Sequence, residues 1–372
     1  MRLLVISKTA PFDGGGAETV VWEIGKRLAR QGDEIHYFCP TPTTSVPETH
    51  DNIHFHYVPT PESFILNRVL FFVKGLFHYR SVFREVDPDV VLDNASPFPF
   101  VLAYAYGDAP VVTKVHTIYR KLAFECKPNL LIKVGTVAGE QLYRLRDGGN
   151  IICVSESTRS RVQQLVRNNP EDVHLVENSV DISGLEYNFA RNSDTVLCLA
   201  THRPQKGIEY LIRAWPQIKA EHPEVELKIA GSGPETEKLE ALAASLDLDD
   251  VEFLGFVSLE RKRGLLRESY AYVLPSIIEG HPLAHMEALA SGCVVVSTDT
   301  WGVRDVVEHE KTGLLVESGS PEDLAVQVTR VLADRDLGDR LARAGAASLD
   351  EYSWDDAAAD EREILQQIVD ET

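Results

Sequence analysis

The sequence is poor in several features, and each shortage argues against a class of protein. Five cysteines occur in 372 residues, and no two of them form a C-x-x-C pair. This argues against a disulfide framework and against a zinc site built on cysteine, and it indicates a reducing compartment. No apolar run approaches the roughly 20 residues that a membrane-spanning helix needs. Met1–Ser7 holds a short apolar run before Lys8, typical of a first strand rather than a secretory signal, so we expect a cytoplasmic protein.

Positive charge is also scarce. The chain carries 37 Lys and Arg against 57 Asp and Glu, a net charge of −20. Most of the deficit lies in the second half, because residues 191–372 hold 18 Lys and Arg against 35 Asp and Glu. Phosphate backbones require a cationic surface, so we expect no nucleic acid among the partners.

Two motifs that mark other enzyme classes are missing from their expected places. A metal-dependent transferase needs a D-x-D at the end of a strand, but Asp87–Asp89 precedes its predicted strand and Asp247–Asp249 lies in a polar loop. A dinucleotide-binding enzyme needs G-x-G-x-x-G after the first strand and an acid after the second. Here residues 14–16 read G-G-G, and the second predicted strand ends at Phe38–Pro40 without an acid.

What the chain does have is a regular alternation of short β-branched runs with longer helical patterns. Such alternation predicts parallel sheets covered by helices on both faces. The polar stretch Asn188–Asp194 predicts a hinge between two Rossmann-like domains, 1–187 and 195–350. We expect a last helix at 351–372 to cross back and pack toward the first domain. We expect the domains to face each other across a central cleft, with ligand at the carboxyl ends of the strands. The predicted strands are Leu3–Ser7, Ile35–Phe38, Val90–Leu92, Val111–Val115, Ile151–Val154, Val173–Val176, Thr195–Ala200, Val225–Ala230, Val251–Leu254, Ala271–Leu274, Val294–Ser297 and Gly313–Val316.

The most informative stretch is a predicted strand, loop and helix at Leu274–Gly292. Glu279 lies in the loop, Pro282 suits a first helical turn, and Glu287 lies inside the helix. The free N–H groups and the positive dipole end of a helix start form a site for phosphate. Glu287 then lies where it can hold the hydroxyls of a ribose. The alternative, that Glu287 only complements the helix dipole, stays open at this point.

Two other loops are expected at the same sheet edge. Thr201–Gly207 follows one predicted strand and brings Arg203 and Lys206, which can neutralise a diphosphate. Gly231–Glu235 follows the next strand, and its glycines let the backbone approach a ligand closely. Each loop alone is an ordinary turn, but three at one edge favour a shared ligand.

These segments resemble family 4 of the retaining glycosyltransferases, which have the GT-B fold. The resemblance spans nearly the whole chain, and its most specific part is the pair Glu279 and Glu287 with seven residues between them. It implies a hexosyltransferase-like enzyme that transfers a sugar from a UDP- or GDP-sugar to a glycan or lipid-linked acceptor, without a metal or other cofactor. The other matching segments are Gly14–Glu18, Val154–Ser157, Glu177–Asp181, Arg203–Gly207, Gly231–Glu235, Phe253–Gly255 and Thr312–Val316.

The resemblance also implies roles for single residues. Glu287 would bind the donor ribose, and Glu279 would contact the transferred sugar. Lys206 would stabilise the departing diphosphate, doing electrostatically what a metal does elsewhere. His116 corresponds to a histidine that faces the sugar from the first domain, so the expected catalytic residues are His116, Glu279 and Lys206. The expected donor-binding residues are Gly15, Gly16, Thr201, Arg203, Lys206, Gly231, Gly280, His281, Pro282, Leu283 and Glu287.

The chain departs from the family pattern at two places. The family has Gly-Arg five residues before the lysine, where this chain has Ala200 and Thr201. We expect Arg203 to supply the missing guanidinium. Trp301–Asp305 lacks the paired glycines and the Pro-Glu of the family, and Asp305 stands where glutamate is usual.

The acceptor side of the sequence is less informative. Residues 64–84 are rich in Phe, Leu and Val and carry Arg68, Lys74, Arg80 and Arg84, and residues 120–146 form a second basic stretch. In so acidic a chain this clustering predicts peripheral contact with anionic lipid at the inner face of the cell membrane. A buried helix with solvated arginines is the alternative. A sugar-nucleotide epimerase on the same scaffold and an inactive nucleotide-sugar-binding homologue remain open as alternative functions.

Overall fold

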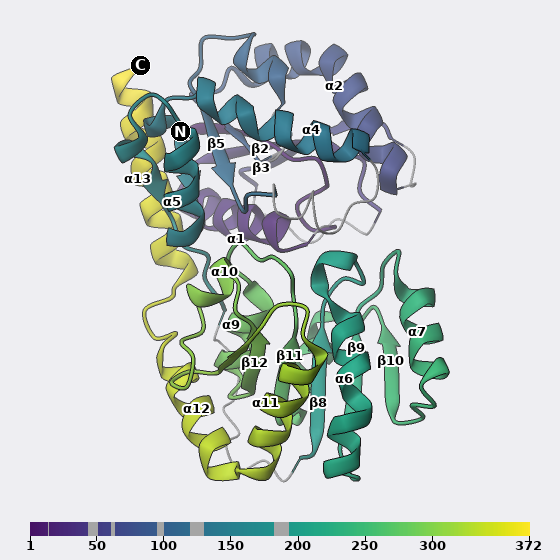
Figure 1. Ribbon diagram of the computed structural model, residues 1–372. Coiled ribbons are helices and arrows are strands. Elements are labelled where there is room, and N and C mark those ends of the chain that lie inside the picture. The colour runs from purple at the N-terminus through teal and green to yellow at the C-terminus, as the bar shows by residue number, and fades with distance from the viewer. Residues whose placement is uncertain (14, 44–50, 61–63, 95–99, 120–129, 182–192) are drawn as a thin grey trace. The chain divides into compact units, whose positions relative to one another are not determined.

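The fold is described from a computed structural model, which describes residues 1–13, 15–43, 51–60, 64–94, 100–119, 130–181 and 193–372. The chain divides into two compact units (Figure 1). Unit 1 comprises Met1–Ser179 together with Ser353–Thr372, and unit 2 comprises Val180–Tyr352. The predicted hinge at 188–194 falls almost entirely outside the described residues. None of the described helices combines the length and apolar content that crossing a membrane requires.

Unit 1 is built on a parallel sheet of seven strands in the order β3-β2-β1-β4-β5-β6-β7. The strands are β1 Arg2–Ile6, β2 Glu34–Pro40, β3 Ile53–Val58, β4 Val90–Asp93, β5 Val111–Val115, β6 Ile151–Cys153 and β7 His174–Leu175. The helices are α1 Gly16–Arg30, α2 Phe64–Val86, α4 Leu130–Gln141, α5 Glu156–Leu165 and α13 Trp354–Glu371, with short 3-10 turns at Val101–Tyr104, Leu142–Leu145, Gly148–Asn150 and Pro170–Asp172. The edge strand β3 was not predicted from the sequence.

Helix α1 shows why the alternation predicted this architecture. Val20, Val21, Ile24 and Leu28 recur at helical spacing and are all buried. The helix ends where Gly32 adopts a φ of +97°, a left-handed conformation that glycine reaches without steric cost. The buried face of α1 packs on the sheet and positions the loop after β1.

The C-terminal helix α13 (yellow in Figure 1) belongs to unit 1 and packs against α1. Lys114 on β5 and Glu361 on α13 form an ion pair, and their side chains are 0% and 1% exposed. Arg362 adds a second link, from its Nε to Asp33 Oδ2 at 2.7 Å. The last helix is therefore held to the first sheet by charges as well as by apolar contact.

Unit 2 repeats the plan with a parallel sheet of six strands in the order β10-β9-β8-β11-β12-β13. The strands are β8 Thr195–Leu199, β9 Glu226–Ala230, β10 Val251–Gly255, β11 Ala271–Leu274, β12 Val294–Thr298 and β13 Leu314–Val316. The helices are α6 Ile208–Glu221, α7 Thr236–Ser245, α8 Leu259–Glu268, α9 Leu283–Ala290, α10 Trp301–Arg304, α11 Pro321–Ala333 and α12 Arg335–Ala347, with a 3-10 turn at Pro204–Lys206.

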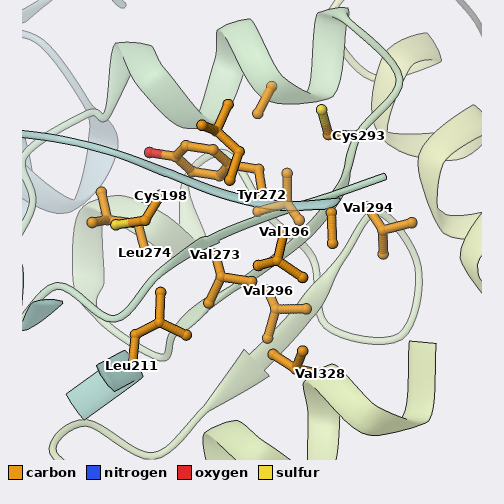
Figure 2. Close-up of a cluster of buried hydrophobic side chains, with 14 of the residues drawn as sticks. Val196, Cys198, Leu211, Tyr272, Val273, Leu274, Cys293, Val294, Val296 and Val328 are labelled. Atoms are coloured by element: carbon orange, nitrogen blue, oxygen red, sulfur yellow. The ribbon is translucent and has the colours of Figure 1, made fainter. Parts of the chain in front are cut away.

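The core of unit 2 lies on both faces of its central strands. Figure 2 shows Val196 and Cys198 of β8 beside Tyr272 of β11 and Val294 of β12, all buried. The Tyr272 hydroxyl donates to the carbonyl oxygen of Leu199 at 3.2 Å, so this large ring leaves no buried donor unpaired. Strands covered on both faces have continuous apolar sequences, which is why they were predictable. The predicted α/β class with two Rossmann-like domains is confirmed.

Candidate functional site

In unit 2 the strand order reverses between β8 and β11, which are neighbours in the sheet. The loops that leave such a pair of strands run to opposite sides, and parallel α/β sheets bind their ligands in the crevice this opens. The loop after β8 is Ala200–Gly207, and the loop after β11 is Pro275–Pro282. These are two of the three loops that the sequence predicted to share a ligand.

The backbones of these two loops are in direct contact. The Ile277 N–H donates to the Gln205 carbonyl oxygen at 2.9 Å. Gly207 has a φ of +61°, and a Cβ added there would lie 2.0 Å from the Pro275 carbonyl oxygen. Only glycine fits this position, because a side chain would both strain the backbone and displace the neighbouring loop. The contact fixes the spacing of the side chains that follow.

Lys206 and Glu279 meet across this contact. The Lys206 Nζ lies 2.6 Å from Glu279 Oε1, and the Ser276 hydroxyl donates to the same oxygen at 2.6 Å. The two charged side chains are 23% and 10% exposed. Burial alone would raise the pKa of the Glu279 carboxyl, but the nearby Lys206 charge and the two hydrogen bonds lower it below its usual range. Glu279 is therefore ionised at neutral pH and holds Lys206 in place.

Helix α9 begins next to this pair. Pro282 occupies the N-cap position and Leu283 is the first helical residue, so the loop of Glu279 leads into a helix N-terminus. A Cβ on Gly302 would lie 2.1 Å from the Gly280 carbonyl oxygen, which shows how closely α10 supports the loop from behind. His281 is buried beside the ring of Tyr352 at 5.9 Å, and burial lowers its pKa to about 3. His281 is therefore neutral and adds no charge to the helix start.

Glu287, one turn into α9, is paired with a residue that the sequence did not single out. The Lys262 Nζ on α8 lies 2.5 Å from Glu287 Oε1, and the two side chains are 23% and 24% exposed. A carboxylate among apolar neighbours requires such a partner. No sequence signal links Lys262 to Glu287, because the pair joins two helices that are separated along the chain by β11. The pairing gives Glu287 a structural partner on α8 besides the dipole of its own helix.

The third predicted loop packs against the first. Gly231 has a φ of +130°, and a Cβ there would lie 1.9 Å from the Ala200 carbonyl oxygen. The His202 N–H donates to the Ser232 carbonyl oxygen at 3.1 Å. Thr201 is exposed on this loop and Arg203 is half-buried. The sequence-predicted residues Thr201, Arg203, Lys206, Gly231, Glu279, Gly280, His281, Pro282, Leu283 and Glu287 thus all lie on loops or helix starts at the carboxyl edge of this one sheet, or one turn beyond.

The segment Trp301–Asp305, which departs from the family pattern, has a local structural role. The Arg304 side chain forms a fork with the Asp299 carboxylate, with Nη2 2.7 Å from Oδ2. The hydrogen bond from Arg304 and its charge lower the pKa of Asp299 below its usual range. This pair ties the last residue of α10 to the residue that follows β12.

In unit 1, His116 follows β5 and hydrogen-bonds to Asn94, which follows the neighbouring strand β4. The His116 Nε2 lies 2.6 Å from Asn94 Oδ1. Burial, with the charges of Lys114 and Lys8, lowers the pKa of His116 well below its usual range, so the ring is neutral. Asn94 was missed by the sequence reasoning. Its Nδ2 is buried, and no described residue accepts a hydrogen bond from it.

The glycine-rich loop lies at the same edge of the unit 1 sheet. Gly15 is the N-cap of α1, and its N–H donates to Glu18 Oε2 at 3.1 Å, while Gly16 is the first helical residue. Gly14 lies outside the described residues. The loops after β1, β4 and β5 therefore gather Gly15, Gly16, Asn94 and His116 at one sheet edge, the counterpart of the edge described in unit 2.

Known protein families match both units. The family described as Glycosyltransferase Family 4 matches residues 14–183, and the family described as Glycosyl transferases group 1 matches residues 186–348. An uncharacterised glycosyltransferase of Methanocaldococcus jannaschii is 33% identical over 225 residues, which cover 56% of this chain and 57% of that protein. The matched region thus spans little more than half the length of that curated relative.

Solved structures are similar over the whole chain. Sucrose-phosphate synthase from Thermosynechococcus elongatus has a TM-score of 0.88 at 19% identity, with 100% of both chains covered. HepE of Anabaena, solved in complex with UDP and glucose, has a TM-score of 0.77 at 18% identity, covering 99% of this chain and 100% of that chain. At these identities the likeness shows the fold, which is GT-B. The two family matches together take in every strand of both sheets except β1, and the chain belongs to the family 4, group 1 type of glycosyltransferases.

Proposed function

We propose that this protein transfers a sugar from a UDP- or GDP-sugar to a glycan or lipid-linked acceptor, with retention of the anomeric configuration. The observation that carries the proposal is the ion pair of Lys206 with Glu279 beside the start of α9. It brings a cation, an ionised carboxylate and a helix N-terminus to one point at the topological switch of unit 2. Support for a nucleotide donor comes from HepE, which was solved with UDP and glucose.

In the proposed donor complex each part of this edge has a separate duty. The segment from Gly280 to Leu283, which leads into α9, receives the diphosphate at the free N–H groups of the loop and of the helix start. Glu287 accepts hydrogen bonds from the ribose hydroxyls, and Glu279 contacts the transferred sugar. Glu287 is held by Lys262, so a ribose would share or displace that ammonium group.

Lys206 is the proposed source of leaving-group stabilisation. Negative charge develops on the diphosphate as the sugar–oxygen bond breaks, and a fixed ammonium group at that position lowers the barrier. Glu279 holds the Lys206 side chain in position before the donor arrives. We assign no protein nucleophile, and we propose that Arg203 assists Lys206 at the diphosphate. We further propose that His116, Gly15 and Gly16, at the carboxyl edge of the unit 1 sheet, also bind substrate.

Thermal-shift measurements with UDP-, GDP- and ADP-sugars test the donor assignment. A ligand at 100 times its Kd stabilises the native state by about 2.7 kcal/mol, so one nucleotide series should raise the melting temperature of unit 2. Glu287→Gln should sharply reduce that rise. Glu268→Gln removes a charge from exposed Glu268 on α8 and should leave the rise intact. No stabilisation by any nucleotide sugar would refute the proposed donor site.

Product analysis separates transfer from the alternative activities. NMR of the product formed with acceptor should show the anomeric configuration of the donor. Conversion of the sugar nucleotide without acceptor would instead identify an epimerase, and tight binding without turnover would identify an inactive homologue. We also propose that no metal takes part, so a chelator should leave the transfer rate unchanged.

The acceptor is proposed to be lipid-linked and reached by peripheral membrane contact through residues 64–84 and 120–146. Among described side chains on α2, Phe77 is 81% exposed, with Val73 and Leu76 at 49% and 47%. Arg80 lies over the Tyr106 ring at 4.9 Å, which leaves an aromatic and cationic surface beside these apolar side chains. The side chain of Arg68 and residues 120–129 lie outside the described part. The protein should co-sediment with anionic liposomes at low salt, and Phe77→Ser should weaken this. Equal sedimentation of the variant would contradict the proposed surface.

A further inference from the structure

Strands β2 and β3 of unit 1 place a group of titratable side chains on one face of the sheet, away from the glycosyltransferase motifs. Glu34 and His36 are two residues apart on β2, and His54 and His56 are two residues apart on the edge strand β3. The parallel register pairs His36 with His54. Because side chains two apart on a strand share a face, all four point to the same side.

The ligand atoms of three of these residues have the spacing of a metal site. Glu34 Oε1 lies 3.2 Å from His36 Nε2 and 3.5 Å from His54 Nε2, and the three atoms all lie within 4.8 Å of one another. Zinc bonds of about 2.0–2.1 Å at tetrahedral angles place ligand atoms roughly 3.4 Å apart. Two of the three separations already match this value, so small rotations of exposed side chains suffice to enclose an ion.

His36 is the most buried member of the group. It is 8% exposed, and its buried Nε2 lies 3.2 Å from Glu34 Oε1. Its other ring nitrogen, Nδ1, lies 3.0 Å from His56 Nε2. When Nδ1–H donates to His56, the lone pair of Nε2 is directed at Glu34 and His54. Metal-binding histidines are typically oriented by a hydrogen bond of this kind from the second ring nitrogen.

The surrounding charge favours a cation. No described lysine or arginine pairs with Glu34, whose partners are the two histidines. Glu85 on α2 lies close enough for its charge to act on His56, so this side of the sheet carries a second carboxylate. Two imidazoles and one carboxylate form a ligand set for zinc and its neighbours in the transition series, rather than for magnesium or calcium.

We propose that Glu34, His36 and His54 bind one divalent transition-metal ion of the zinc type, with His56 orienting His36. The remaining coordination positions face solvent, because Glu34 and His54 are each 43% exposed. The ion would join the edge strand β3 to β2 and stabilise unit 1 by mass action. This site is separate from the proposed donor site, and its test does not depend on glycosyl transfer.

The test uses the full chain without a histidine tag, stripped of metal with a chelator. Co²⁺ is followed by its visible ligand-field absorption, and Zn²⁺ is followed by calorimetry and by the thermal shift of unit 1. We expect one ion per chain. His54→Gln and Glu34→Gln each remove one ligand at an exposed position and should weaken binding by at least about tenfold, as loss of even an outer-shell partner does.

His309→Gln is the matched control. His309 is 46% exposed and lies 3.9 Å from the Glu310 carboxylate in unit 2, a histidine–carboxylate pair without a second histidine. The His309→Gln variant should bind Co²⁺ with the same affinity as the unaltered chain. Circular dichroism of the metal-free variants verifies that they fold. The absence of saturable Co²⁺ binding, or equal affinity in His54→Gln and Glu34→Gln, would overturn the assignment.

Discussion

The buried ion pair between Lys114 and Glu361 allows a quantitative prediction about how the last helix is held. The two side chains are 0% and 1% exposed, and Glu361 Oε1 has no hydrogen-bond partner among the described residues. Glu361→Leu would leave the Lys114 ammonium group buried without a countercharge. Removing one partner of such a pair costs about 3–5 kcal/mol, because the remaining charge keeps its desolvation penalty. Leucine is a good helix former, so the loss does not come from the helical propensity of α13.

The expected effect is large enough to measure directly. Unit 1 has about 200 residues, and for a domain of that size 1 kcal/mol shifts the melting temperature by about 2–4 °C. Glu361→Leu should therefore lower the transition of unit 1 by about 6–20 °C. Hydrogen exchange measured by mass spectrometry should show faster exchange throughout α13. The double variant Lys114→Met with Glu361→Leu should recover most of the loss, because two apolar side chains need no countercharge.

Asp355→Asn is the control on the same helix. Asp355 pairs with Arg27 of α1, but it is 82% exposed, so its loss should cost less than about 1 kcal/mol. If Glu361→Leu costs no more than Asp355→Asn, the buried pair does not hold α13. If the double variant is less stable than Lys114→Met alone and Glu361→Leu alone, the explanation by an uncompensated charge is wrong.

Four further predictions concern the candidate functional residues. Lys206→Ala should lower kcat/KM by about 10²–10³, as removal of one fixed stabilising donor does; Lys206→Arg should retain part of the rate, and equal rates in all three proteins would contradict the assigned role. Glu287→Gln should weaken nucleotide binding roughly 10- to 150-fold, because a hydrogen bond to a charged group contributes about 1.5–3 kcal/mol; calorimetry measures this, and unchanged affinity would remove Glu287 from the ribose site. The lowered pKa of Glu279 means that its ion pair contributes stability above the ordinary carboxyl range, and that this stability is lost as the pH falls through the lowered value; acid unfolding of Glu279→Gln should lack this step. The pKa of His116 lies well below its usual range, so NMR should find its ring neutral between about pH 6 and 8.

Much of the fold was predictable from local pattern. β8, β11 and β12 are continuous apolar runs because both faces of a parallel sheet are covered. β3 was not predicted because His54 and His56 alternate with Ile53, Phe55 and Tyr57. Such an alternation with histidine is not typical of a strand inside an α/β sheet. Half-buried edge strands follow a period of two rather than a continuous run, so they require a different pattern to be recognised.

The residues of the candidate site were also predictable only in part. Lys206, Glu279 and Glu287 were found because each lies on a loop or helix start that the sequence marks with glycine or proline. Lys262 and Asn94 were not found, since each acts through a partner on another element, and no local spacing encodes that contact. Their roles follow from strand order, which brings distant segments to one edge.

The discontinuity of unit 1 has a consequence for how the protein is made. The ribosome completes Met1–Ser179 long before it reaches Ser353–Thr372, while Val180–Tyr352 emerges as one uninterrupted stretch. At about 5–20 residues per second, Lys114 and Asp33 wait roughly 10–70 seconds for Glu361 and Arg362 to be synthesised. Unit 2 therefore has the opportunity to fold before unit 1 is complete, and the nascent first sheet carries Lys114 without its countercharge during that interval. The half of the chain that leaves the ribosome first is therefore the half that stays incomplete longest. A chaperone that binds nascent chains would bind this half.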